Sequence, residues 1–356
     1  MNDLSALARA FDIQAGVCVA FGSPFSGALL ARAKEDIDAG GVTARLLAHW
    51  AGATTRTFVN EAVAIRWLGA AHDLALSGET PALSAAYPSP GGPGDPEAAW
   101  NALADAMIAE PGRFADFMSH EPQTNEVRRS ACLLPGFVAL AKATGLPLHL
   151  FEIGASAGLN QLWDRFAYDF GPGRAWGDPA SPVRLEAEWR GPWPALESPV
   201  TVISRAACDR KPVDIRDPNA RRRLKAYVWA DQFDRLAWLE AAIAAALAND
   251  TRVDAEDAVT WTLKRAGPTP GAVTVLFHSI FWQYMPAESQ VALTRVVAAL
   301  GAKATLDAPF AWLRMEPPPE NLATVELRLT LWPGGEDRLL GHVHPHGAWI
   351  AWGEAA

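Results

Sequence analysis

Apolar residues recur at helical spacing through the first part of the chain. Asp3–Ala20 and Ser26–Ala39 carry such stripes, and the helix-breaking triplet Gly22-Ser23-Pro24 separates them. Further helices are expected over Ala44–His49, Asn60–Ser77, Pro96–Ala109 and Gly112–Ser119, with a loop at Tyr87–Asp95. Since no segment before about Leu148 alternates like a strand, the pattern predicts a helical N-terminal domain over residues 1–145, a candidate lid over a cleft.

A different rhythm follows, in which short apolar runs alternate with helical stretches. Leu148–Ile153, bounded by Pro147 and Gly154, indicates a buried parallel strand, and Ala272–Phe277 is the clearest second one. We expect other strands at Val183–Glu188, Val200–Ser204, Val253–Val259, Ala304–Leu306 and Ala311–Met315, and helices at Leu159–Phe166, Asn219–Ala248 (broken near Trp229) and Pro286–Leu300. Such alternation predicts βαβ units and a largely parallel sheet over residues 146–356.

The end of the chain alternates between apolar and polar residues. Val325–Trp332 runs into the turn Pro333-Gly334-Gly335, and Arg338–His342 and Ala348–Trp352 continue the pattern. This arrangement is typical of antiparallel strands. The predicted fold class is therefore α/β, with a Rossmann-like, mostly parallel sheet that closes in antiparallel strands.

Composition narrows the classes of partner. The formal net charge is −9, which disfavours broad electrostatic capture of nucleic acid, and the one obvious basic cluster, Arg221–Arg223, is interpreted as a solvated helix face. The three cysteines are far apart and form no CxxC pair, so we expect no disulfide framework and a reducing cytoplasm. No apolar run reaches the roughly 18 residues needed to span a bilayer, and the N-terminus does not resemble a signal peptide.

One turn carries the strongest candidate chemistry. Glu152–Gly158 reads EIGASAG at the end of the first predicted strand. Small residues let the chain turn sharply into a helix and let a ligand approach the backbone. The spacing fits neither the G-x-G-x-x-G of dinucleotide sites nor a P-loop. It matches the acid-apolar-G-x-G-x-G pattern of S-adenosylmethionine-dependent methyltransferases, with Ser156 in place of the middle glycine. The reversed final strands also favour this methyltransferase variant of the Rossmann-like fold.

A cofactor at the carboxyl ends of the strands would meet acids from the second and third strands. Asp209 is the first candidate for the ribose hydroxyls, Glu186 and Glu188 are alternatives, and the pair Asp257-Ala258 would face adenine. The predicted S-adenosylmethionine site consists of Glu152, Gly154, Ala155, Ser156, Gly158, Asp209, Asp257, Ala258, His278 and Ser279.

The stretch after the fourth strand, VLFHSIFWQYMP, would stand beside the reactive methyl group. His278 and Tyr284 are the catalytic candidates, since a histidine can act as a base near neutral pH. Substrate contacts are expected from Gln123, Thr124, Asn125, Glu126, Trp163 and Trp282. For Thr124 or Asn125, the slightly favoured alternative is a cap of the helix that follows. His342, His344 and His346 alternate, but Pro345 and Gly347 indicate a turn, so no metal site is expected.

Several longer stretches resemble a bacterial family, domain of unknown function 2332. They are FGSPFSGALL (Phe21–Leu30), QTNEVRRSACLLPG (Gln123–Gly136), LFEIGASAGLNQLWDRFAYDF (Leu150–Phe170), YVWADQFDRL (Tyr227–Leu236), VTVLFHSIFWQYMP (Val273–Pro286), WLRMEP (Trp312–Pro317) and ELRLTLWPGG (Glu326–Gly335). The resemblance implies an architecture: a helical N-terminal region and a methyltransferase-like C-terminal region.

The hypothesis that follows is an S-adenosylmethionine-dependent methyltransferase acting on a small-molecule acceptor. The alternative is a non-catalytic module that keeps the fold and binds a ligand or a protein. Redox chemistry with NAD is disfavoured by the glycine spacing.

Overall fold

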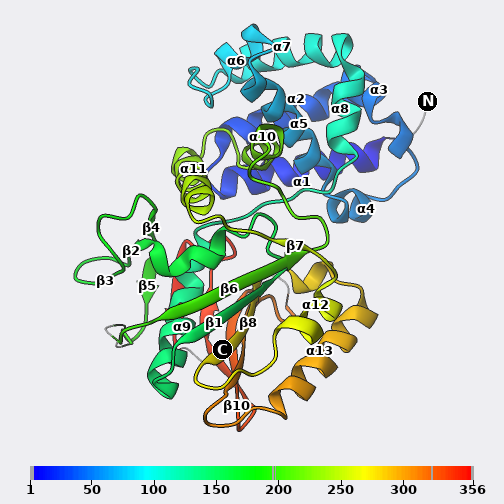
Figure 1. Cartoon of the computed structure of the whole chain (residues 1–356). Coiled ribbons are helices and arrows are strands. Elements are labelled where there is room, and N and C mark those ends of the chain that lie inside the picture. Colours follow the sequence, from blue (N-terminus) through cyan, green and yellow to red (C-terminus); the bar gives the residue numbers. More distant parts are fainter. Residues whose placement is uncertain (1–3, 195, 197, 322–323, 354–356) are drawn as a thin grey trace. The chain divides into compact units, whose positions relative to one another are not determined.

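The computed structural model describes residues 4–194, 196, 198–321 and 324–353 (Figure 1). They form two compact units: residues up to Thr124 with Arg216–Ala237, and Asn125–Ile215 with the residues from Trp238 onward. The expected division after residue 145 is a single cut in the chain, whereas these units interleave. No helix among the described residues has the length and apolar character needed to cross a membrane.

The first unit is helical, as its apolar spacing predicts. Its helices are α1 (Ser5–Ala20), α2 (Pro24–Asp38), α3 (Val42–Leu46), η1 (Ala48–Trp50), α4 (Thr55–Asn60), α5 (Val63–Ser77), α6 (Pro81–Ala86), α7 (Pro96–Ala109), α8 (Pro111–Met118) and α10 (Pro218–Ala226). Helix α5 is apolar on most sides and is buried for that reason. Its Trp67 packs against Phe11 and Trp100, with ring centroids 5.9 and 6.4 Å away.

The second unit is built on a sheet whose nine described strands lie in the order β5-β12-β11-β10-β9-β8-β1-β6-β7. The strands are β1 (Leu148–Ile153), β5 (Glu188–Arg190), β6 (Val202–Asp209), β7 (Asp254–Ala255), β8 (Val273–Ser279), β9 (Phe310–Glu316), β10 (Glu326–Trp332), β11 (Glu336–Val343) and β12 (Trp349–Trp352). Strands β7, β6, β1, β8 and β9 pair in parallel, and β9 to β12 pair antiparallel. The prediction of a large, mostly parallel sheet with antiparallel C-terminal strands is confirmed.

Three expected strands differ from the structure. Of Val253–Val259, only β7 (Asp254–Ala255) is a strand, and α12 (Ala258–Arg265) begins before the expected end. Val183–Glu188 contributes β4 (Arg184–Glu186), which joins β2 (Ala167–Asp169) and β3 (Ala175–Trp176) in a separate small sheet. Ala304–Leu306 forms no strand and lies in the loop before β9, so that prediction is wrong. Leu306 is 86% exposed there, so this short run buries no apolar side chain of the kind that a core strand would contribute.

Helices cover both faces of the sheet (Figure 1). On one face, α12 (Ala258–Arg265) and α13 (Ala287–Gly301) pack Trp261 and Leu293 against Phe151 and Ile153 of β1. On the other, α9 (Arg129–Thr144) stacks Phe137 on Trp163 of the 3₁₀ helix η2 (Leu159–Arg165), at a centroid distance of 4.3 Å.

Successive strand residues face opposite sides of a sheet. Phe151 and Ile153 face α12 and α13, so Glu152 between them faces α9 and η2. The expected break near Trp229 is also present, because α10 ends at Ala226 and α11 (Phe233–Ala248) begins later.

Candidate functional site

The strand order reverses between β1 and β8. From β1 the chain builds outward to β6 and β7, and it then returns to place β8 on the other side of β1. In open α/β sheets, ligands bind outside the carboxyl ends of the strands at such a reversal. The turn Gly154–Gly158 after β1 and the segment after β8 both lie at this point, which is therefore the candidate site.

The turn after β1 has three left-handed residues. Gly154, Ser156 and Gly158 have φ of +64°, +53° and +72°. A Cβ atom on Gly154 would lie 2.1 Å from the ring of Phe281, and one on Gly158 would lie 2.7 Å from Val253. Both positions therefore require glycine, while Ser156 stores backbone strain of about 1–3 kcal/mol.

Several backbone donors of this turn are already used within the protein. Ala155 donates its N–H to the carbonyl of Cys208, and Gly158 donates to Ala155. The N–H of Leu159 is bonded to Asn125 Oδ1 at 2.9 Å. A phosphate cradle needs such N–H groups free. The turn is therefore unsuited to a pyrophosphate, in agreement with the mismatched dinucleotide and P-loop spacings.

Unpartnered side-chain oxygens, in contrast, gather at the same place. Glu152 is 3% exposed and its Oε2 has no hydrogen-bond partner among the described residues. Ser156 Oγ and Asn160 Oδ1 are likewise buried without a partner there. Burial, with Asp209 nearby, raises the pKa of Glu152 well above its usual value. Because unsatisfied buried polar groups are costly, this cluster points to a ligand with hydrogen-bond donors.

Asp209 is the acid from the neighbouring strand at this turn. It ends β6, which pairs with β1, and its carboxylate accepts the N–H groups of Ser156 and Lys211 at 2.9 and 2.8 Å. Since a carboxylate offers about four acceptor positions, capacity for further donors remains. The alternatives Glu186 and Glu188 lie on β4, in the small sheet, and on β5, at the far edge of the large one.

Asp257 is placed as a helix cap. Its exposed side chain accepts the N–H groups of Val259 and Thr260 at 2.9 and 3.2 Å, which begins α12. Ala258 is buried in the core beside α13. Capping accounts for Asp257, and its expected contact with adenine stays a prediction.

His278 is sealed in the protein. It is fully buried, its Nδ1 lies 2.6 Å from Glu316 Oε1, and its Nε2 accepts from Trp312 Nε1 at 3.1 Å. We assign the proton to Nδ1, because Nε2 is the acceptor. Since both ring nitrogens are engaged, His278 has no lone pair available for a substrate. It acts instead as a positioning residue.

What His278 positions is the turn that follows β8. Glu316 also accepts the N–H of Phe281 at 2.9 Å, which holds the Phe281 ring against Gly154. Ile280, which lies between the end of β8 and Phe281, has φ of +50°, an uncommon conformation for a β-branched residue. Such strain persists only where the surroundings enforce it, and it often marks functional sites.

The other aromatic candidates are dispersed. Tyr284 is 73% exposed in η3 (Trp282–Tyr284), whereas Trp282 stacks on His278 at 5.7 Å. Trp163 is fully buried against Phe137, and its Nε1 has no hydrogen-bond partner among the described residues, so its expected contact with substrate stays a prediction. The structure therefore does not bring His278 and Tyr284 together as an accessible catalytic pair.

The segment before α9 crosses the carboxyl edge of the sheet. Besides the bond from Leu159 to Asn125, the Glu126 carbonyl accepts from Asn160 Nδ2 at 3.4 Å. Arg129 donates to the carbonyl of Ser279, at the end of β8, at 3.2 Å. Asn125 and Glu126 thus lie beside the glycine turn, and their expected contact with substrate stays a prediction. Gln123 and the exposed Thr124 belong to the helical unit.

Two features of the site escape the interpretation given from sequence. The first is the pair Glu126 and His346, whose Oε2 and Nδ1 atoms lie 3.1 Å apart although 220 positions separate them. The second is that Gly154–Gly158 also fits G-x-S-x-G, the nucleophile-elbow pattern. An elbow serine exposes its hydroxyl, but Ser156 Oγ is buried and no described histidine bonds it. Hydrolase chemistry is therefore not supported.

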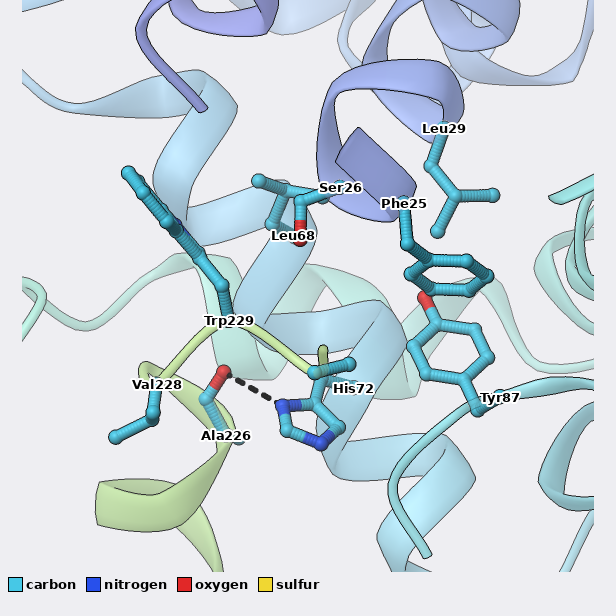
Figure 2. A pocket seen from close by; sticks show the side chains of 10 residues that line it. Phe25, Ser26, Leu29, Leu68, His72, Tyr87, Ala226, Val228 and Trp229 are labelled. Atoms are coloured by element: carbon cyan, nitrogen blue, oxygen red, sulfur yellow. Dashed lines mark hydrogen bonds between the residues drawn. The ribbon is translucent and has the colours of Figure 1, made fainter. Parts of the chain in front are cut away.

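A separate cavity lies within the helical unit (Figure 2). His72 points into it and shares a hydrogen bond of 3.2 Å between Nδ1 and the carbonyl of Ala226, while His72 Nε2 and Tyr87 Oη have no partner among the described residues. Burial lowers the pKa of His72 to about 4, so the ring is neutral. The cavity measures about 10 Å³, which suits one water molecule rather than a cofactor.

Comparison with known proteins identifies the family. Residues 8–352 match the model of a family described as an uncharacterized protein conserved in bacteria, domain of unknown function 2332, and the chain belongs to it. No curated protein and no solved structure matches the chain.

Proposed function

We propose that this protein is an S-adenosylmethionine-dependent methyltransferase for a small-molecule acceptor, with the cofactor at the strand reversal between β1 and β8. The observation that carries the proposal is the buried Glu152 carboxyl, whose Oε2 is unpartnered at the end of β1, directly before an acid-x-G-x-S-x-G turn.

The residues present fit the chemistry of this cofactor. S-adenosylmethionine has cationic sulfonium and ammonium groups and a ribose diol, and it has no phosphate. The site offers acceptors for such groups, while the N–H groups of Ala155, Ser156 and Gly158 donate to other atoms of the protein. Glu152 and Asn160 would receive the ammonium group, and Asp209 the ribose hydroxyls. A bound cation would also favour the ionised form of Glu152, which burial disfavours.

The cofactor supplies a methyl group that is already activated on a sulfonium. The chain then has to orient the acceptor and exclude water, and positioning alone supplies much of the rate. The missing side chains of Gly154 and Gly158 leave room for the Phe281 ring and for Val253, which pack closely against this turn. Phe281, held by Glu316, shields Gly154 with an apolar ring.

The second candidate function is a non-catalytic binding module. The sealed His278 and the exposed Tyr284 favour it, because neither is placed as an accessible base. This alternative predicts that a nucleoside ligand binds without methyl transfer.

Calorimetric titration with S-adenosylhomocysteine tests the proposal, with NAD⁺ as the comparison ligand. We expect binding of the former only. Asp209→Asn should weaken it about 10-fold or more, since a hydrogen bond to a charged group is worth about 1.5–3 kcal/mol. The matched control is Glu186→Gln, an exposed acid on β4. Absence of binding at millimolar S-adenosylhomocysteine, by folded protein, would contradict the proposal.

A further inference from the structure

We propose that the Ser156 hydroxyl determines the ligand specificity of this site by donating a hydrogen bond to the carboxylate of the ligand's amino-acid end. The site therefore selects nucleosides that carry a complete α-amino acid over those that carry an amine alone. This inference rests on the proposed function. It gives a role to the residue at which the turn departs from the glycine pattern.

The backbone at Ser156 has a conformation that favours glycine. Its φ is +53°, and it lies between Gly154 and Gly158, whose φ angles are also positive. A side chain in this left-handed region strains the backbone, and a glycine would remove the strain. Serine at this position therefore lowers the stability of the turn relative to glycine.

The hydrogen bonds of the Ser156 backbone do not require its side chain. The N–H donates to Asp209 Oδ2 at 2.9 Å, and the carbonyl accepts the N–H of Val213 at 3.1 Å. Every residue except proline has both of these backbone groups, so a glycine would make the same two bonds. The geometry of the turn thus does not explain why the side chain is present.

The hydroxyl of Ser156 adds a second cost. The residue is 8% exposed, and its Oγ is buried without a hydrogen-bond partner among the described residues. A buried hydroxyl that makes no hydrogen bond has lost its water without compensation. Strain and an unpaired polar group on one residue are both explained if a ligand pairs with the hydroxyl.

The neighbouring oxygens indicate which ligand atom this hydroxyl meets. Glu152 Oε2 and Asn160 Oδ1 are also unpartnered among the described residues, and both can only accept once Glu152 is ionised. An α-amino acid carries its ammonium and its carboxylate on one carbon atom. A ligand whose ammonium lies at Glu152 and Asn160 therefore brings its carboxylate close to these acceptors, and the Ser156 hydroxyl supplies the donor that the carboxylate needs.

Calorimetric titration with two ligands that differ only in this carboxylate tests the inference. One is S-adenosylhomocysteine, and the other is its decarboxylated analogue, in which an aminopropyl chain replaces the amino-acid end. We expect Ser156→Ala and Ser156→Gly to bind S-adenosylhomocysteine about 10-fold or more weakly than the wild type, because they lose a hydrogen bond to a charged group. Both variants should bind the analogue with unchanged affinity.

Two controls separate ligand recognition from stability. Ser204→Ala removes another buried hydroxyl that has no partner among the described residues, but Ser204 pairs with His149 near the start of β1, at the opposite end from the turn. Its affinities for both ligands should match those of the wild type. Ser156→Gly relieves the strain, so its Tm should be at or above that of the wild type.

The outcomes distinguish this inference from the proposed function. Equal losses for the two ligands, no loss for either, or the same selective loss in Ser204→Ala overturns the inference alone. A Tm of Ser156→Gly below that of the wild type also overturns it, because the serine would then stabilise the fold. Absence of binding of either ligand to the folded wild type overturns the proposed function with it.

Discussion

A histidine–carboxylate pair lies on each side of the carboxyl edge of the sheet, and the two pairs differ in how buried they are. On the side of α13, which we call the sealed side, His278, Phe281, Trp312 and Glu316 satisfy one another. On the side of α9, which we call the receptive side, His346 contacts Glu126 and its side chain is 33% exposed, and the Oε2 atom of Glu152 has no hydrogen-bond partner among the described residues. A carboxylate–histidine pair therefore does not by itself indicate catalysis. Solvent exposure of the histidine distinguishes a pair that could meet a ligand from one that only stabilises the fold.

The largest effect is expected from breaking the sealed pair. Glu316→Ala would leave His278 without its buried partner and free the N–H of Phe281. Each buried donor left without its acceptor costs about 1–3 kcal/mol, and here there are two, His278 Nδ1–H and the N–H of Phe281. Urea unfolding should show this loss. A loss below 1 kcal/mol would mean that the two sides do not differ as described.

A smaller loss of stability is expected at the contact between Gly154 and Phe281, where the two sides meet. Gly154→Ala introduces a methyl group at φ +64° against the Phe281 ring. We expect a destabilisation of about 2–4 kcal/mol from strain and overpacking. In the double variant with Phe281→Ala, the cost of Gly154→Ala should fall, and additive costs in this cycle would contradict the contact.

The receptive side should make stability depend on pH through Glu152. Its raised pKa in the folded protein means that this group contributes stability below the ordinary carboxyl pKa and loses it as pH rises through the folded value. Glu152→Gln should therefore be the more stable protein at pH 8, with a smaller difference at pH 4. Each unit of pKa elevation corresponds to about 1.4 kcal/mol. Thermal unfolding across this range checks the sign, and equal pH dependence would refute it.

The smallest change in stability is expected at the pair formed by Glu126 and His346. His346→Ala removes a partly exposed imidazole from the buried Glu126 carboxylate, and a hydrogen bond to a charged group is worth about 1.5–3 kcal/mol. The same urea experiment should show a smaller loss than for Glu316→Ala. A loss as large as that of Glu316→Ala would make His346 structural.

The order of elements was accessible from sequence, and the partnerships across the chain were not. Local apolar runs predicted β1 and β8, and the final alternation predicted the antiparallel strands. The position of Asp209 beside the turn also followed, because parallel strands end at one edge.

The contacts between residues far apart in the sequence depend on which strands pair and in which register. Nothing local shows that His278 would meet Trp312 and Glu316, or that His346 would meet Glu126, since strand pairing sets both. Asp257 illustrates a different limit. An acid after a short strand fits both a ligand contact and a helix cap, and only the start of α12 at Ala258 reveals the cap.

The most direct test of the central claim is the calorimetric titration of wild type and Glu152→Gln with S-adenosylhomocysteine. The account predicts that the wild type binds and that Glu152→Gln, although folded, binds at least 10-fold more weakly, because the amide cannot carry the charge that receives the ammonium group. Equal affinity of the two proteins, or no binding to either, would contradict it.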